Sequence, residues 1–387
     1  MNYSEESIQR HKEYKGKWGM HATVPVETRE DLALAYTPGV GAVSMAIAED
    51  KSLVKEMTMK GHTVAIVSDG SAVLGLGNIG PEAALPVMEG KAILFKKFAN
   101  IDGVPLVLDT QDPQKIISIV RAIAPTFGGI NLEDIAAPNC FVVEDALQDL
   151  GIPVFHDDQH GTAIVVLASL INASRVVGKD IKDMKVVING SGAAGIAIAK
   201  LLGCIGQEAS ICQPVANLLV CDSQGIISSA REGLNEYKQQ LLSFTNLHDI
   251  SGSLQDALKD ADCFIGVSKA NILTPEHIQE MATDAIIFAL ANPVPEIMPD
   301  IARAAGAAVV GTGRSDFPNQ INNVLAFPGI FKGALESGAT RITPEMKIAA
   351  AYALAGMITE PHAESLLPDV FDPTIANVIA EAVKGVK

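Results

Sequence analysis

Three glycines at fixed spacing are the first residues of this chain whose pattern suggests a chemical task. They form Gly190-x-Gly192-x-x-Gly195, which follows the apolar strand pattern 186–188 and leads directly into the apolar, helix-like run 196–202. In this context the glycines permit a tight turn, a close approach of the backbone to a pyrophosphate, and close packing of helix on strand. The helix N-terminus then offers free N–H groups to phosphates. The pattern predicts a Rossmann-type dinucleotide site made by Gly190, Ser191, Gly192, Ala193, Ala194 and Gly195.

A carboxylate follows the next strand pattern, 217–221, at Asp222. At this position it can accept a hydrogen bond from a ribose 2′-hydroxyl, and it repels a 2′-phosphate. The separation from the glycines is longer than usual, so residues 206–216 are expected to form an inserted loop. No arginine adjoins Asp222 along the chain, where Arg231 is the nearest downstream, whereas Ser223 could bind a phosphate. We expect NAD as the cofactor, with NADP as the alternative.

Acidic residues form a second group with chemical potential. Glu133 and Asp134 close one apolar stretch, and Asp157 and Asp158 follow a short strand pattern. Converging carboxylates with room for water suit a hard cation such as Mg²⁺ or Mn²⁺. Two histidines flank the second pair, but no further histidine or cysteine stands at the spacing that a zinc site needs. The residue types therefore favour magnesium or manganese.

Strand and helix patterns alternate along most of the chain, which is typical of parallel α/β sheets. The expected strands are 63–68, 104–108, 153–155, 186–188, 217–221, 263–267, 285–290 and 309–311. The expected helices are 81–99, 113–124 and 162–177. Ligand sites of such sheets lie at the carboxyl ends of the strands.

These elements predict an α/β protein with two domains. We expect a substrate- and metal-binding domain over residues 1–160, in which residues up to about 35 form helices or an arm, and a Rossmann domain over residues 161–315. Residues 316–387 are expected to form mostly helices that pack back on the first domain.

The composition favours an enzyme of the cytoplasm that acts on a small molecule. The net charge of −16 over 387 residues argues against a general nucleic-acid surface. The N-terminal residues are polar and lack a targeting pattern, and the apolar run 163–171 is too short to span a bilayer. The five cysteines are scattered, which is more typical of buried thiols in a reducing compartment than of a disulfide framework.

The sequence resembles the malic enzymes of the short prokaryotic type. The motifs that carry this resemblance run over nearly the whole chain, in the family's order: Tyr36-Thr-Pro-Gly-Val40, the loop from Val67 to Gly80, Glu89-Gly-Lys91, Glu133-Asp134, His156-Asp-Asp-Gln-His-Gly-Thr-Ala163, the glycine turn, Ala291-Asn-Pro293 and Asn322-Asn323. The resemblance implies oxidative decarboxylation of L-malate to pyruvate and CO₂, with a divalent metal ion and a nicotinamide cofactor.

The resemblance also implies catalytic roles. Lys91 resembles the base that takes the proton of the C2 hydroxyl as hydride leaves, which requires that partial burial and a nearby metal lower its pKa. Tyr36 resembles the acid that protonates the enolate left after CO₂ departs, and Asp157 orients Lys91 or a metal-bound water. The metal, a Lewis acid for that enolate, is held by Glu133, Asp134 and Asp158.

The substrate contacts are implied in the same way. Asn292 and Asn323 hold the substrate carboxylate, and Asn322 lies near the nicotinamide. One departure from the family is the arginine that grips a malate carboxylate in larger malic enzymes, because this chain has Ser71-Ala72 there. Backbone N–H groups of the loop 70–75 are candidates for its replacement.

Three other functions compete with this interpretation. A malolactic enzyme of the same family would release lactate without net oxidation. A sensor or scaffold would bind the dinucleotide without catalysis, although it need not keep Lys91, Tyr36 and the acids. An amino-acid dehydrogenase would need no metal. The resemblance further implies a homodimer, for which the N-terminal segment through Tyr36 is a plausible interface.

Overall fold

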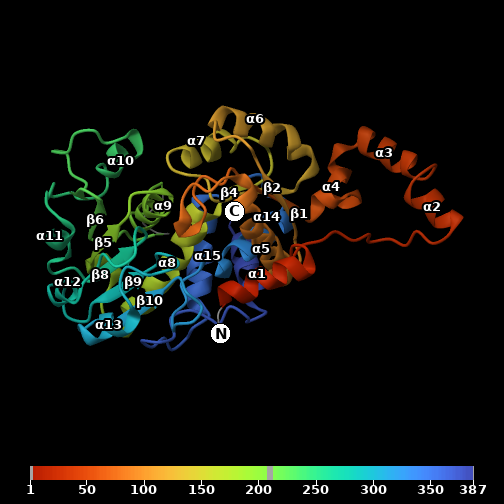
Figure 1. The fold of residues 1–387 in the computed structure, drawn as a ribbon. Coiled ribbons are helices and arrows are strands. Elements are labelled where there is room, and N and C mark those ends of the chain that lie inside the picture. Colours follow the sequence, from red (N-terminus) through yellow and green to blue (C-terminus); the bar gives the residue numbers. More distant parts are fainter. Residues whose placement is uncertain (1–2, 207–211, 387) are drawn as a thin grey trace.

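The computed structural model describes residues 3–206 and 212–386, which build two parallel sheets (Figure 1). The first sheet has the order β2-β1-β3-β4 and the second the order β10-β9-β8-β5-β6-β7, in which only the short β7 is antiparallel. The strands of the first sheet are β1 (Thr63–Ser68), β2 (Asp102–Val107), β3 (Gly129–Leu132) and β4 (Val154–His156). Those of the second are β5 (Lys185–Asn189), β6 (Asn217–Asp222), β7 (Gly225–Ile226), β8 (Cys263–Gly266), β9 (Ile286–Ala289) and β10 (Val309–Thr312).

Helices cover both sheets, so the expected α/β fold with a Rossmann-type domain is confirmed. The first sheet carries α5 (Pro81–Ala99), α6 (Pro113–Ile123) and α7 (Asn139–Ala146). The second carries α9 (Ala193–Leu202), α10 (Glu236–Leu241), α11 (Leu254–Leu258), α12 (Pro275–Gln279) and α13 (Pro299–Ala304). Strands β1, β8 and β9 are buried along their whole length, as expected when both faces of a parallel sheet are covered, whereas the edge strand β2 is mostly half-buried.

The last three long helices return to the first domain, as expected. They are α14 (Phe327–Glu336), α15 (Pro344–Gly356) and α16 (Ile375–Lys384). Phe327 and Phe331 of α14 meet Phe95 of α5 edge to face, with ring centroids 4.7 and 5.3 Å apart. Such aromatic pairs bury a large apolar area in a defined geometry, and this contact fixes the C-terminal helices on the first sheet.

Helix α8 (Asp157–Val177) joins the two sheets and starts five residues earlier than the expected helix 162–177. No loop separates it from β4, which ends at His156. The expected boundary at residue 160 therefore falls within a continuous helix. Strand β3 was not predicted as a strand, although the apolar stretch that Glu133 and Asp134 close includes its residues.

The N-terminal segment begins beside α5 and then forms an arm whose second and third helices extend away from both sheets (Figure 1). It contains α1 (Tyr3–Tyr14), α2 (Arg29–Ala35) and α3 (Val40–Glu49), and none of these helices has a buried residue. Near the end of α1, the backbone N–H of Lys17 donates to Glu89 of α5 at 3.1 Å. The short α4 (Val54–Met57) then leads into the first sheet.

Two helical segments are long and apolar enough to cross a membrane by length and composition alone, Arg29–Glu49 and Asp157–Val177. The second is α8, which extends beyond the run 163–171 on both sides and has 67% of its apolar window buried in the structure. The first combines α2 and α3, and none of its apolar window is buried.

One expectation about the cysteines is wrong, because Cys204 and Cys212 form a disulfide. The two residues are only eight positions apart, and nothing in their spacing distinguishes them from the other three, which are buried thiols as expected. Of the expected loop 206–216, residues 207–211 lie outside the described part of the chain.

A buried amide ties α8 to the C-terminal region. The Asn172 side chain donates to the backbone carbonyls of Ala355 and Leu366 at 2.9 and 2.8 Å. Both bonds lie in the interior, where an unsatisfied polar group is costly.

We therefore predict that Asn172→Ala lowers the free energy of unfolding by about 1–3 kcal/mol, because two buried carbonyls lose their donor. Urea unfolding followed by circular dichroism measures the change. Asn377→Ala, at an exposed position of α16, is the matched control and should change stability little. Equal stability of the two variants would contradict the role assigned to Asn172.

Candidate functional site

The predicted acids meet at the carboxyl edge of the first sheet. Glu133 and Asp134 follow β3, and Asp157 and Asp158 follow β4, the neighbouring strand. Because parallel strands end at the same edge, the two pairs lie side by side. Asp157 and Asp158 also open α8, where the positive end of the helix dipole favours carboxylates.

Lys91 extends from α5 into this group of acids. Its Nζ atom lies 2.8 Å from Oε1 of Glu133 and 2.6 Å from Oδ2 of Asp157. All three side chains are buried, and the ammonium sits 4.4 Å from the ring centre of Phe327. The sequence-based pairing of Lys91 with Asp157 thus agrees with the geometry, whereas its ion pair with a predicted metal ligand was not anticipated.

The acids outnumber the ammonium, and their pKa values reflect this. Burial raises the pKa of Glu133 to about 7, that of Asp157 to about 7 and that of Asp158 to about 6, although Lys91 opposes each shift. Burial would lower the pKa of Lys91, but the charges of Asp157 and Glu133 outweigh it and raise that pKa. The expected fall of the Lys91 pKa toward neutrality presupposes a bound metal ion and stays a prediction; without the ion, the acids around Lys91 favour its charged form.

Three of these acids fit a divalent cation. Glu133, Asp134 and Asp158 each offer a carboxylate oxygen, and these oxygens lie within 4.8 Å of one another. The donor set is all oxygen, as magnesium and manganese prefer. One ammonium among four buried or half-buried carboxylates leaves negative charge uncompensated, which a divalent cation would balance. The predicted metal ligands thus converge, while Asp157 faces Lys91.

A fifth acid, Glu144 of α7, supports the site from behind and was missed in the sequence. Its carboxylate accepts from the backbone N–H of His156 at 3.1 Å and from the Gln159 amide at 3.0 Å, and it pairs with His160 at 2.9 Å. These bonds hold the first turn of α8, which carries two of the acids. No sequence signal marks Glu144, because its partners come from a different element.

The loop after β1 does not offer the free N–H groups expected of a carboxylate clamp. The N–H of Gly70 donates to Ser68 Oγ, that of Ser71 to Asp69, that of Ala72 to the carbonyl of Asp134, and that of Val73 to Gly77. The first part of the loop 70–75 is thus already engaged, so the expectation is wrong for these four groups.

The predicted substrate asparagines follow β9 and β10, and each lies close to an element next to the acids. Asn323 lies against the first turns of α8. A methyl group added at Gly161 of this helix would overlap with the Asp157 carboxylate and would lie 3.1 Å from Cβ of Asn323. A methyl group on Gly75 would overlap with the carbonyl of Asn292, so the loop after β1 touches the loop after β9. Asn322 caps the turn Asn323–Leu325 through its side chain.

Arg314 is a second residue that the sequence did not single out. It follows β10 and donates to the carbonyl of Pro293 at 3.0 Å, next to Asn292. Its guanidinium also makes a two-point ion pair with Asp316 at 2.8 and 2.6 Å. It therefore places a positive charge beside the substrate asparagines.

Tyr36, in contrast, is not brought to the acids. It lies between α2 and α3 on the arm, and 67% of its surface is exposed. Figure 1 shows this part of the arm extending away from α5, which carries Lys91. Within one copy of the chain, the predicted acid catalyst is therefore separate from the predicted base.

Five of the predicted dinucleotide residues, Gly190, Ser191, Gly192, Asp222 and Ser223, line a cavity of about 750 Å³ in the second domain. Gly190 has a φ of 126°, and a methyl group on Gly195 would overlap with the carbonyl of Gly190. Ala193 and Ala194 begin α9, which Gly192 caps. The cavity opens between β5 and β8, where the strand order reverses, which is where such sheets bind their ligands.

Asp222 lies at the rim of this cavity with two cations beside it. Arg231 contacts both of its carboxylate oxygens, at 2.8 and 3.0 Å, and Lys238 contacts one at 2.7 Å. Burial would raise the pKa of Asp222, but these hydrogen bonds outweigh it and lower that pKa to about 2. The argument that no arginine adjoins Asp222 thus holds along the chain but not in space.

Comparison with known proteins agrees with this arrangement. Residues 15–148 match the family model of the malic enzyme N-terminal domain, and residues 159–386 match that of the malic enzyme NAD-binding domain. A Bacillus subtilis protein named bifunctional malic/malolactic enzyme is 55% identical, over 99% of this chain and 92% of its own. An NAD-dependent malic enzyme of Geobacillus stearothermophilus is 52% identical, over 95% and 76%.

Solved structures give the same result. The NAD-dependent malic enzyme of Thermotoga maritima superimposes with a TM-score of 0.93 at 50% identity, covering 98% of this chain and 99% of that one. With both halves matched by family models and this similarity over the full length, the chain belongs to the malic enzyme family.

Proposed function

We propose that this protein oxidatively decarboxylates L-malate to pyruvate and CO₂ with reduction of NAD(P) and with a divalent metal ion. The observation that carries the proposal is the meeting of Lys91, Glu133, Asp134 and Asp158 at one sheet edge. When bound, the cation would act as a Lewis acid toward substrate oxygens. When bound, the nicotinamide would take up the hydride.

The chain's own residues divide the remaining work. Asp157 orients Lys91 through a 2.6 Å contact, and Lys91 receives the proton of the substrate hydroxyl. The amides of Asn292 and Asn323 bind a substrate carboxylate, and Asn322 lies on the nicotinamide side. A sensor or scaffold protein does not need these roles and would have no use for this buried arrangement of charges.

The metal site gives the first test of this function. We predict that Asp158→Ala abolishes tight Mn²⁺ binding and turnover while the fold persists. Loss of even an outer-shell partner typically costs ~10–100-fold in metal affinity or activity, so a direct ligand should cost more. Electron paramagnetic resonance of Mn²⁺ measures binding directly, and Asp183→Ala, at an exposed position, is the control. Undiminished Mn²⁺ affinity, or full activity in excess chelator, would remove the metal from the proposal and favour a metal-free dehydrogenase.

A malolactic reaction is the second candidate, and the bifunctional name of the Bacillus subtilis relative favours keeping it. Both reactions begin with the same substrate and site. Parallel measurement of NAD(P)H, pyruvate and lactate from malate separates them. Reduced cofactor and pyruvate in equal amounts support the malic enzyme reaction, whereas lactate without reduced cofactor supports the malolactic one.

For the cofactor, we propose that the site accepts both NAD and NADP. The Asp222 carboxylate would repel a 2′-phosphate if it stood alone, which was the reason to expect NAD. Arg231 and Lys238 neutralise it and bring one net positive charge to the ribose end of the cavity. The curated relatives likewise include enzymes named for each cofactor.

We predict that the double variant Arg231→Gln/Lys238→Gln lowers kcat/KM for NADP ~10- to 100-fold, because hydrogen bonds to charged groups contribute about 1.5–3 kcal/mol. Its effect on NAD should be smaller. Asp222→Ala should weaken NAD binding and leave the two cations free for the 2′-phosphate of NADP. The ratio of kcat/KM for NAD to kcat/KM for NADP should therefore fall. If neither variant changes this ratio, these residues do not contact the ribose end of the cofactor. Lys259→Gln, exposed on the surface, is the control.

For the second substrate carboxylate, we propose Arg314 in place of the arginine that is absent at Ala72. Its guanidinium already makes a two-point pair with a carboxylate, Asp316, and it lies beside Asn292. A substrate carboxylate could take the place of Asp316 in the same geometry, which suits arginine better than lysine.

We predict that Arg314→Gln raises KM for malate ~10- to 100-fold, the equivalent of one lost charge-assisted hydrogen-bonded pair, and leaves KM for the cofactor within a few-fold of wild type. Arg314→Lys should recover only part of the loss. Arg303→Gln, exposed on α13, is the control. If Arg314→Gln binds malate normally, another group must hold that carboxylate.

We also propose that the protein is a homodimer in which the arm of one copy lies on the other. The apolar helices α2 and α3 have no buried residue in one copy, and Leu34 and Met45 are more than half exposed. An isolated apolar arm of this kind needs a partner. The same arrangement would deliver Tyr36 to the Lys91 of the partner copy, where its role as the acid could be met.

Mixed dimers test this arrangement. Tyr36→Phe and Lys91→Ala should each be nearly inactive, since a positioned acid–base group typically contributes ~10²–10⁴-fold. Co-refolding equal amounts of the two should restore about one quarter of wild-type activity, because half of random dimers are mixed and each has one intact site. No recovery in mixtures whose subunit exchange is verified by mass spectrometry would place Tyr36 in its own copy or outside the mechanism.

A further inference from the structure

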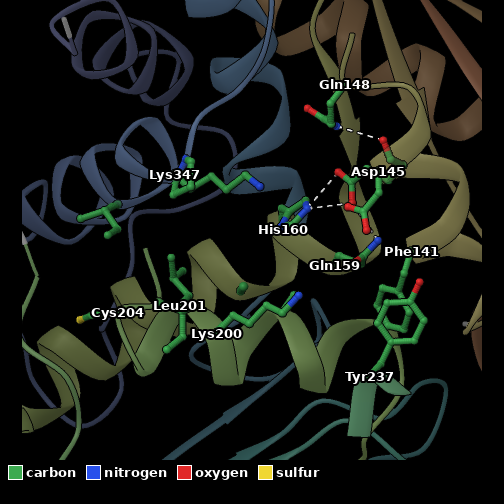
Figure 2. Close-up of a pocket in the computed structure, with 16 residues that line it drawn as sticks. Phe141, Asp145, Gln148, Gln159, His160, Lys200, Leu201, Cys204, Tyr237 and Lys347 are labelled. Carbon is green, nitrogen blue, oxygen red and sulfur yellow. Dashed lines mark hydrogen bonds and ion pairs between the residues drawn. The ribbon is translucent and has the colours of Figure 1, made fainter. Parts of the chain in front are cut away.

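A second cavity, of about 200 Å³, lies where α7, α8, α9 and α15 meet (Figure 2). None of its lining residues belongs to the proposed metal, substrate or cofactor sites. Its volume is below the ~300–1,000 Å³ of sites that hold drug-sized ligands, so it admits only a small molecule.

Two lysines from facing helices extend into this cavity. Lys200 comes from α9 and Lys347 from α15, and Figure 2 shows both side chains directed toward the space beside His160. Within residues 3–206 and 212–386, neither ammonium has a hydrogen bond or an ion pair with another side chain. Lys347 is only partly exposed, and an ammonium held away from water without a close partner is costly.

Within the described part of the chain, the acidic groups near Lys347 do not form a close ion pair with its ammonium. Burial lowers its pKa to about 8, with Lys200 acting in the same direction, although Glu144, Asp145 and Glu345 oppose the shift. Glu144 is already held by three donors, and Asp145 is exposed. The two ammonium groups therefore remain open to a negative ligand.

The rest of the cavity lining is part polar, from Glu144, Asp145, Gln148, Gln159 and His160, and part apolar. Ala163 and Ala197 form part of the wall between the lysines, together with Leu201 and Ile348, and the rings of Phe141 and Tyr237 pack against each other with centroids 4.4 Å apart. A ligand that fits must be charged where it meets the lysines and hydrocarbon between them.

We propose that this cavity binds a short-chain dicarboxylate, with one carboxylate on Lys200, the other on Lys347, and the carbon chain against the apolar wall. This binding site is separate from the proposed function and does not depend on it.

The position of the cavity connects it to the active site. His160 lines the cavity and pairs with Glu144, and Glu144 accepts from the backbone N–H of His156 directly before Asp157. A dianion beside His160 acts on the hydrogen bonds that hold the first turn of α8. Binding in the cavity should therefore change the affinity of the neighbouring acids for a divalent cation.

Calorimetric titration with succinate, in chelator and without cofactor, tests the binding. Succinate has no hydroxyl to oxidise, and under these conditions the proposed metal and nucleotide contribute nothing. We expect saturable binding that weakens at least ~10-fold in Lys347→Met and in Lys200→Met, because each loses a charged partner. Lys115→Met, exposed on α6, should bind as wild type.

The proton balance gives an independent readout. A carboxylate beside Lys347 raises its pKa above about 8, so binding should take up protons near that pH and weaken as the pH rises through it. Titrations in buffers of different ionisation enthalpy measure this uptake. It should vanish in Lys347→Met.

Three results would overturn the proposal. One is the absence of succinate binding in the wild type. Another is binding lost in Asn323→Ala but kept in Lys347→Met, which would place the anion in the active-site cleft. The third is that inorganic phosphate binds in the cavity and succinate does not bind, which would exclude a dicarboxylate. Thermal unfolding of each variant checks that the fold is kept, and exposed Lys200 provides the variant least able to disturb it.

Discussion

The structure depends on the burial of several carboxylates around a single ammonium. Lys91 is tied to Glu133 and Asp157, and charges removed from water in this way need close partners and further donors. The fold supplies these through the N-terminus of α8 and through donors such as the Asn131 amide, 2.9 Å from Glu133. Even so, negative charge is left over, and that excess is what makes the site suitable for a divalent cation. At this edge of the sheet, the same uncompensated charge that is unfavourable for the folded state would favour the binding of a cation.

Much of this could be predicted from the sequence, because the chemistry lies at the ends of strands. Gly190 and Asp222 follow strand patterns directly, so their place at a sheet edge is settled locally. The convergence of Glu133 with Asp158 needed only the assumption that their strands are neighbours in one parallel sheet, although β3 itself was missed. The return of the C-terminal helices to the first domain followed from the resemblance and from their apolar patterns.

What could not be predicted depends on contacts between distant segments. Glu144 reaches His160 from another helix, and Arg231 reaches Asp222 across a turn that no local pattern describes. Arg314 stands near Asn292 only because β9 and β10 are adjacent. The exposure of Tyr36 follows from its place between α2 and α3, neither of which has a buried residue, and the Cys204–Cys212 disulfide from the path of a short loop.

The direct junction of β4 with α8 has a mechanical consequence. Because no loop separates His156 from Asp157, a continuous helix joins the two sheets. Two of the acids, Asp157 and Asp158, lie in its first turn. The second crossing between the domains, residues 313–326, contains little regular structure and carries Arg314, Asn322 and Asn323. The acids of α8 are therefore placed by one continuous helix, whereas the residues that would bind the substrate are placed by tertiary contacts of the second crossing, such as the bonds of Asn319 to Val310 and Ala363. A shift of one domain relative to the other would move the substrate residues while the acids of α8 keep their mutual arrangement.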